Sequence, residues 1–187
     1  MEITESLYVK TREEWRKWLK KNYKSESEIW LVFHNKSSRK RSLSYEDAVE
    51  EALCFGWIDS IVKKLQQHSR VQRFTPRNPK SQYSQLNKER LKRLLRKKKV
   101  IASVRKTLGN LENDNFIFPI DIINEIKKNK DAWKNYQNFS EAYKRIRIAF
   151  IDGGRRRPDV FQQRLNYFIK MTEKNKQYGI KGIEKYI

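Results

Sequence analysis

The chain has 187 residues, enough for one domain, or a domain with a small annex, to bury a core without disulfides or metal ions. One cysteine, Cys54, and two histidines exclude a disulfide framework and argue against a Cys/His metal cage, so we expect neither metal nor cofactor. The net charge is +21, and without a signal-like N-terminus or a long apolar stretch we expect a cytoplasmic protein with no membrane span.

The positive charge is concentrated in the middle of the chain. Residues 1–60 carry 11 Lys and Arg and 11 Asp and Glu, residues 61–109 carry 16 against the single acid Glu89, and residues 110–187 carry 16 against 10. A compositional bias toward lysine would enrich glutamate as well, and the middle third has one acid. We therefore expect a surface that faces a polyanion, with solvated surface charge as the alternative.

The first predicted elements are a short strand, a helix and a second strand. The short strand is expected near Leu7–Val9, and Thr11 and Glu14 have the spacing of a capping box that opens the helix. Residues 29–33, IWLVF, form a continuous apolar run, which is typical of a central strand covered on both faces.

A second helix is predicted to begin at Ser44 and to end before Gly56. The side opposite its apolar face holds Asp47, Glu50, Glu51 and Cys54. This acidic face is the one best placed to pair with the basic middle of the chain.

A β-hairpin is predicted from residues 59–65 and 70–75, although the alternation of the first arm is imperfect. A turn with two prolines follows. Ser81 or Ser84 then caps a helix that runs to about Lys98.

The stretch from residue 73 to residue 90 is the strongest candidate for a binding site. Three polar residues in its strand are two positions apart, so an extended backbone places them on one face. The helix that follows offers free amides and a positive dipole end, and it carries an asparagine and an arginine on its core-facing side. We predict an anion-binding site formed by Arg73, Thr75, Arg77, Ser81, Ser84, Asn87 and Arg90.

After residue 100 the pattern is helical. Pro119 fits the first turn of a helix through Lys128, Ser140 caps a helix that ends near Ile151, and Pro158 begins a last long helix. Within the apolar arc of that last helix lies Arg164, which either joins an anion pocket or caps carbonyls of a neighbouring helix.

These elements together predict an α+β fold. Residues 1–100 are expected to form a small, mainly antiparallel sheet with packed helices, and residues 101–187 a helical region.

Two segments, AVEEALCFGWID at 48–59 and RFTPRNPKSQYSQLNKER at 73–90, resemble the YdeI/OmpD-associated family, also labelled bacteriocin-protection proteins. The resemblance covers most of the chain and implies a link to antimicrobial-peptide or stress resistance. In residues 156–161 this chain has RRPDVF where the family has a run like KRPETR. Carried over by position, the resemblance adds Glu51, Cys54, Trp57 and Asp59 as supporting residues of the predicted site. Tyr83 stands where the family usually has Trp and keeps a stacking ring; it and Arg164 complete the supporting residues.

Three classes of function follow from these features. The preferred one is non-catalytic binding of a phosphate-containing ligand, with nucleic acid as the favoured ligand. Tyr83, Trp57 or Phe74 would stack on a base, although core packing is the preferred interpretation for the last two.

The second class is an enzyme for a small phosphorylated or carboxylate substrate, with Asp59 or Glu51 as general base and Cys54 as nucleophile. We lean against it because the sequence has no recognised catalytic motif. In the third class the arginines pair with the protein's own acids and the chain is a protein-interaction module.

Overall fold

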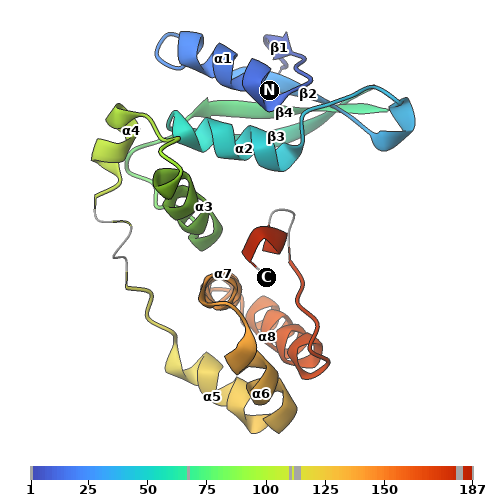
Figure 1. Ribbon diagram of the computed structural model, residues 1–187. Coiled ribbons are helices and arrows are strands. Elements are labelled where there is room, and N and C mark those ends of the chain that lie inside the picture. Colours follow the sequence, from blue (N-terminus) through green and yellow to red (C-terminus); the bar gives the residue numbers. More distant parts are fainter. Residues whose placement is uncertain (1, 67, 110, 112–114, 180–182, 187) are drawn as a thin grey trace. The chain divides into compact units, whose positions relative to one another are not determined.

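The computed structural model describes residues 2–66, 68–109, 111, 115–179 and 183–186 (Figure 1). The chain forms two compact units, Met1–Gln82 with Arg90–Leu111, and Tyr83–Glu89 with Glu112–Ile187. The first contains a four-stranded sheet with helices and the second is helical, so the predicted α+β class is confirmed.

The sheet of the first unit has the strand order β1-β2-β4-β3. Its strands are β1 (Ser6–Leu7), β2 (Ile29–His34), β3 (Trp57–Gln66) and β4 (Ser69–Pro76). Only β1 and β2 run parallel; the other two pairs are antiparallel, and β2 is an interior strand as predicted. The register of β3 against β4 shifts between Asp59 and Val62, and this irregularity explains the imperfect alternation of the first hairpin arm.

Two helices cover one face of the sheet, α1 (Arg12–Asn22) and α2 (Tyr45–Cys54). The indole ring of Trp15 packs edge-on against Phe74 of β4 at 5.5 Å, and its Nε1 donates to the carbonyl of Ala48 at 3.0 Å. The buried Trp57 ring lies edge-on to Trp18 of α1 at 5.7 Å. Phe74 and Trp57 are therefore core residues.

Both helices begin at the predicted caps. Thr11 Oγ1 accepts from the amide of Glu14 at 3.2 Å, and Ser44 Oγ accepts from the amide of Asp47 at 3.1 Å. At the end of α2 the chain turns through Gly56, whose φ of +75° is a conformation that side-chain-bearing residues rarely adopt.

The first unit is completed by the later part of α3 (Gln85–Arg96), by α4 (Ala102–Thr107) and by the 3₁₀ turn η1 (Lys36–Ser38). Leu91 and Leu94 of α3 are buried. The amide of Ile101, just before α4, donates to the carbonyl of Cys54 at 3.1 Å, which fixes the α3–α4 turn to the end of α2.

The second unit contains α5 (Ile120–Lys128), α6 (Lys130–Asn138), α7 (Glu141–Asp152), α8 (Pro158–Glu173) and the 3₁₀ turn η3 (Ile183–Tyr186). The core that joins them includes the buried Ile122, Tyr143, Ile148 and Phe168. The predicted starts are confirmed: Ser140 caps α7 and Pro158 occupies the first turn of α8. No helix within the described ranges has the length and apolar character needed to cross a bilayer.

Candidate nucleic-acid interface

The acidic side of α2 is buried in the first unit and is neutralised there by arginines. The side chains of Glu50 and Glu51 are 1% exposed. Arg12 of α1 lies 2.7 Å from Asp47 and 3.0 Å from Glu50, and its Nε donates to Glu51. Arg16, one helical turn later, donates to the other carboxylate oxygen of Glu51 at 2.5 Å.

These contacts change the electrostatics of both α1 arginines. Burial lowers the pKa of Arg12, but hydrogen bonds and charge attraction from Glu51 and Glu50 outweigh it, so the pKa is raised overall. The same balance of burial against Glu51 raises the pKa of Arg16. Both guanidinium groups are therefore held in their charged form by the fold.

Helix α3 supplies the pairing that the sequence predicted for the acidic face. Arg93 pairs with Glu50, and Arg90, 5% exposed, pairs with Glu46 at 2.6 Å.

Sequence reasoning did not identify Arg12 and Arg16 as partners. A signal was available, because arginines four positions apart in α1 match acids of α2 that share one helical face.

On β4, Arg73 and Thr75 share one face of the sheet, as predicted. That face is opposite to Phe74, which packs against α1, so both residues lie on the side away from α1. The Nε of Arg73 donates to Glu28 at 2.6 Å.

Arg90 lies on the other side of the sheet. Its partner Glu46 is in α2, and the neighbouring Tyr45 donates to Asp59 at 2.6 Å. Asp59 is paired in register with Phe74, so α2 covers the face that Phe74 occupies. The structure therefore places Arg73 and Arg90 on opposite faces, although the sequence analysis grouped them in one site.

The turn after β4 is held together by its own hydrogen bonds. Arg77 donates to the carbonyl of Asn78 at 3.2 Å and to that of Ser81, and Ser81 Oγ donates to the Asn78 carbonyl at 2.8 Å. Ser84 is the residue that caps α3, since its Oγ accepts from the amide of Asn87 at 3.3 Å. Tyr83, Ser84 and Asn87 belong to the second unit, whereas Arg77 and Ser81 belong to the first.

The supporting residues of the predicted site are engaged in packing and hydrogen bonds. Burial raises the pKa of the Cys54 thiol to about 11, so the thiol is protonated near neutral pH. Burial and the hydrogen bond to Asp59 raise the pKa of Tyr45. In the second unit Arg164 donates to the carbonyl of Phe150 at 2.6 Å and lies 3.9 Å from its ring, which corresponds to the second of the two roles considered for it.

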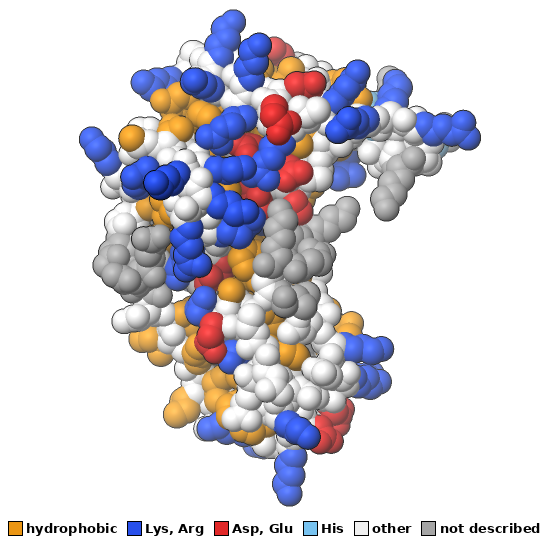
Figure 2. Space-filling view, viewed as in Figure 1, with side chains coloured by type: hydrophobic (Ala, Val, Ile, Leu, Met, Phe, Trp, Pro, Cys, Tyr) orange, Lys and Arg blue, Asp and Glu red, His pale blue; other side chains and the backbone are white. Residues whose placement is uncertain are grey.

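One group of exposed cations in the first unit lies on α1 and the turn after it, at the end of α3 and on α4. We call this set the α1/α4 surface; it consists of Lys17, Lys20, Lys21, Lys24, Arg96, Lys97, Lys98, Arg105 and Lys106. Arg16 of α1 donates to the carbonyl of Lys99 at 2.8 Å, so the two groups of cations adjoin. Figure 2 shows Lys and Arg side chains gathered over this part of the first unit, in the upper left of the view.

The net charge of the first unit is also strongly positive. The first unit holds 26 Lys and Arg against 11 Asp and Glu, a net charge of +15. Five of those acids, Glu28, Glu46, Asp47, Glu50 and Glu51, pair with arginines.

Two family models match separate parts of the chain. Residues 7–107 match a family described as a domain of unknown function, DUF8412. Residues 115–175 match the family described as bacteriocin-protection, YdeI or OmpD-associated, which confirms the resemblance inferred from the sequence for this part of the chain and not for most of it. The two motifs that first indicated this resemblance lie within the match at 7–107. No curated protein and no solved structure matches the chain.

Proposed function

We propose that this chain, which belongs to the family of the domain of unknown function DUF8412, binds nucleic acid through the α1/α4 surface without catalysing a reaction. The observation that carries the proposal is the separation of charge within the first unit. Acids of α2 are buried against arginines, while the lysines of α1 and α4 are exposed. The field outside the unit is therefore positive and attracts a polyanion.

The spacing of the α1 lysines supports contact with a phosphate backbone. Lys17, Lys20 and Lys21 are three and four positions apart, so they are neighbours on one side of the helix. Lys24 follows in the turn after α1. Lysine ammonium groups on flexible stems neutralise phosphates without reading sequence, so we expect binding with little base-sequence preference.

The turn after β4 adjoins the α1/α4 surface. We therefore include Arg77 and Lys80 of this turn as further phosphate contacts. The amide of Arg77 donates to the carbonyl of Gly56 at 2.8 Å, and Gly56 lies against Val104 of α4. The anion-binding role predicted for this turn is thus retained as part of the proposal.

An enzymatic role is less favoured because the residues it would use are occupied by the fold. Both carboxylate oxygens of Glu51 pair with arginines, Asp59 accepts from Tyr45, and Cys54 is a buried, protonated thiol. A nucleophile needs a lowered pKa or an adjacent base, and the pKa of Cys54 is raised instead.

The proposal is tested by fluorescence anisotropy with a mixed-sequence 20-nucleotide single strand at 25 to 300 mM NaCl. The logarithm of the association constant should fall linearly with the logarithm of the salt concentration, with a slope of about −0.7 for each phosphate neutralised. The triple variant Lys97→Gln, Arg105→Gln, Lys106→Gln should make that slope shallower by about 2.

The matched control is Lys130→Gln, Lys134→Gln, Lys170→Gln, which removes the same charge from exposed positions of the second unit. It should change the slope little. A flat salt response in the wild type, or an equal loss in both triple variants, would refute the proposal. Bacteriocin protection, which the family matched by residues 115–175 carries in its description, would be tested separately by challenging a deletion strain with bacteriocin.

A further inference from the structure

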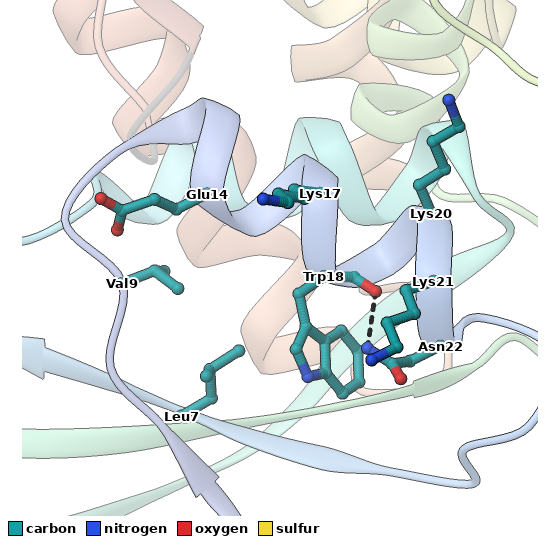
Figure 3. Close-up of a pocket in the computed structure, with 8 residues that line it drawn as sticks. All are labelled: Leu7, Val9, Glu14, Lys17, Trp18, Lys20, Lys21 and Asn22. Carbon is teal, nitrogen blue, oxygen red and sulfur yellow. Dashed lines mark hydrogen bonds between the residues drawn. The ribbon is translucent and has the colours of Figure 1, made fainter.

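A groove lies between α1 and the β1 segment of the first unit (Figure 3). Its volume is about 860 Å³, within the range of about 300–1,000 Å³ that is usual for small-molecule sites. The lining residues are Leu7 and Val9 from the β1 segment and, from α1, Glu14, Lys17, Trp18, Lys20, Lys21 and Asn22. An apolar floor is thus combined with three lysines that also belong to the α1/α4 surface.

The aromatic ring in this groove is held in a fixed orientation. Trp18 is half-buried, stacks on Trp15 at 5.2 Å with an interplanar angle of 18°, and meets Trp57 edge-on. Figure 3 shows its indole ring between Leu7 on one side and Lys21 and Asn22 on the other. A ring with so little freedom loses little entropy when a second ring stacks on it.

The charge of the groove selects an anionic occupant. Lys17, Lys20 and Lys21 line it against one acid, Glu14, whose Oε2 accepts from the backbone amide of Lys10 at 2.7 Å. An occupant that has a flat ring beside a negative charge can stack on Trp18 and pair with the lysines. A nucleotide has this combination.

We propose that the groove holds a base of a single-stranded nucleic acid, stacked on Trp18, with Lys17 and Lys21 at the adjoining phosphates. This inference rests on the proposed function and narrows it to single strands. In a duplex each base is already stacked on its neighbours, whereas the unpaired bases of a single strand are free to stack on aromatic side chains.

The test compares two dye-labelled 12-nucleotide strands of equal charge, oligothymidine and its abasic counterpart, at fixed salt. Phosphate contacts are the same for both strands, so the proposed function alone predicts equal affinity. Stacking of one base should make the oligothymidine bind about 5- to 150-fold more tightly than the abasic strand.

Two variants assign the difference to the groove. Trp18→Leu should abolish the preference for oligothymidine while leaving the affinity for the abasic strand unchanged. Because Trp18 also packs on Trp15 and Trp57, Leu7→Trp provides a second test in which the groove is filled and Trp18 is kept. The control is Lys106→Gln, which removes a charge of the α1/α4 surface from a residue that does not line the groove; it should weaken both strands equally.

The possible results separate the two proposals. Equal affinity for both strands in the wild type overturns the stacking site and leaves phosphate binding intact, whereas no binding of either strand at low salt overturns the proposed function itself. If the preference is unchanged in both Trp18→Leu and Leu7→Trp, the base stacks elsewhere and this site is wrong. A poly-glutamate peptide that binds the wild type but not Leu7→Trp, without any preference between the two strands, would reassign the groove to an acidic protein partner.

Discussion

The substitution Glu51→Gln tests the buried ion pairs that shape the charge of the first unit. Glu51 is 1% exposed, and its two oxygens accept from Arg12 Nε and from Arg16 at 2.5 Å. Glutamine has nearly the same size but no charge. It also replaces one acceptor oxygen by an NH₂ group, which then faces a guanidinium donor with nothing to accept its hydrogen bond.

The size of the effect follows from what each arginine can do once the carboxylate is lost. Removing one partner of a buried pair costs about 3–5 kcal/mol. Here Arg12 and Arg16 are 22% and 38% exposed, and Arg12 keeps Asp47 at 2.7 Å and Glu50 at 3.0 Å. Partial hydration and the remaining acids reduce the penalty, so we expect a loss of about 2–3 kcal/mol in the free energy of unfolding.

Urea unfolding followed by tryptophan fluorescence reports mainly on the relevant unit, because four of the five tryptophans lie in it: Trp15, Trp18, Trp30 and Trp57. With a denaturant slope of about 2 kcal/mol per molar urea, the midpoint should fall by about 1–1.5 M. The control Glu13→Gln removes the same charge from an exposed position of α1 and should change stability by less than about 0.5 kcal/mol. If the two variants unfold at the same midpoint, the acidic side of α2 is not held as described and the argument fails.

Three further outcomes are expected. Arg90→Met should lower the free energy of unfolding by about 2–3 kcal/mol without any ligand, because the buried ion pair between Arg90 and Glu46 at 2.6 Å is lost; an equally stable variant would instead mean that the charge is kept for a ligand. Cys54, whose pKa is raised to about 11 by burial, should react with a thiol reagent at pH 8 at least about 100-fold more slowly in the native than in the urea-unfolded protein; rapid native labelling that phosphate prevents would favour a catalytic thiol. Ser140→Ala removes the acceptor of the Tyr143 amide at 3.1 Å and should cost about 1 kcal/mol in thermal unfolding followed by circular dichroism; no change would show that the cap is dispensable.

The starts of helices were predictable because they depend on neighbours in sequence. A cap such as Thr11, Ser44 or Ser140 accepts from an amide three positions away, so the signal and the structure lie within one turn. The β3–β4 hairpin was predictable for the same reason, since its arms are joined by a short turn. Its register shift at Asp59 was visible only as weak alternation.

The basic surface on α1 could not be predicted from the distribution of charge along the chain. Residues 1–60 have no net charge, and this balance hides the lysines of α1. The fold buries the acids of α2 against Arg12 and Arg16, and leaves exposed lysines such as Lys17 and Lys21 to define the surface. A segment with no net charge thus contributes a basic face, because its acids are neutralised by arginines inside the unit while its lysines are exposed.

The sequence by itself determined the α+β class, the helix starts and the basic character of the chain, because periodicity, caps and composition are local properties. Tertiary structure alone decided which charges meet. Arg73 and Arg90 are 17 positions apart in one motif, yet pleating and helix packing place them on opposite faces of the sheet, with Glu28 and Glu46 as their respective partners. Ion-pair partners are set by distance in space, and the chain separates Arg12 from Glu51 by 39 positions before packing brings them together.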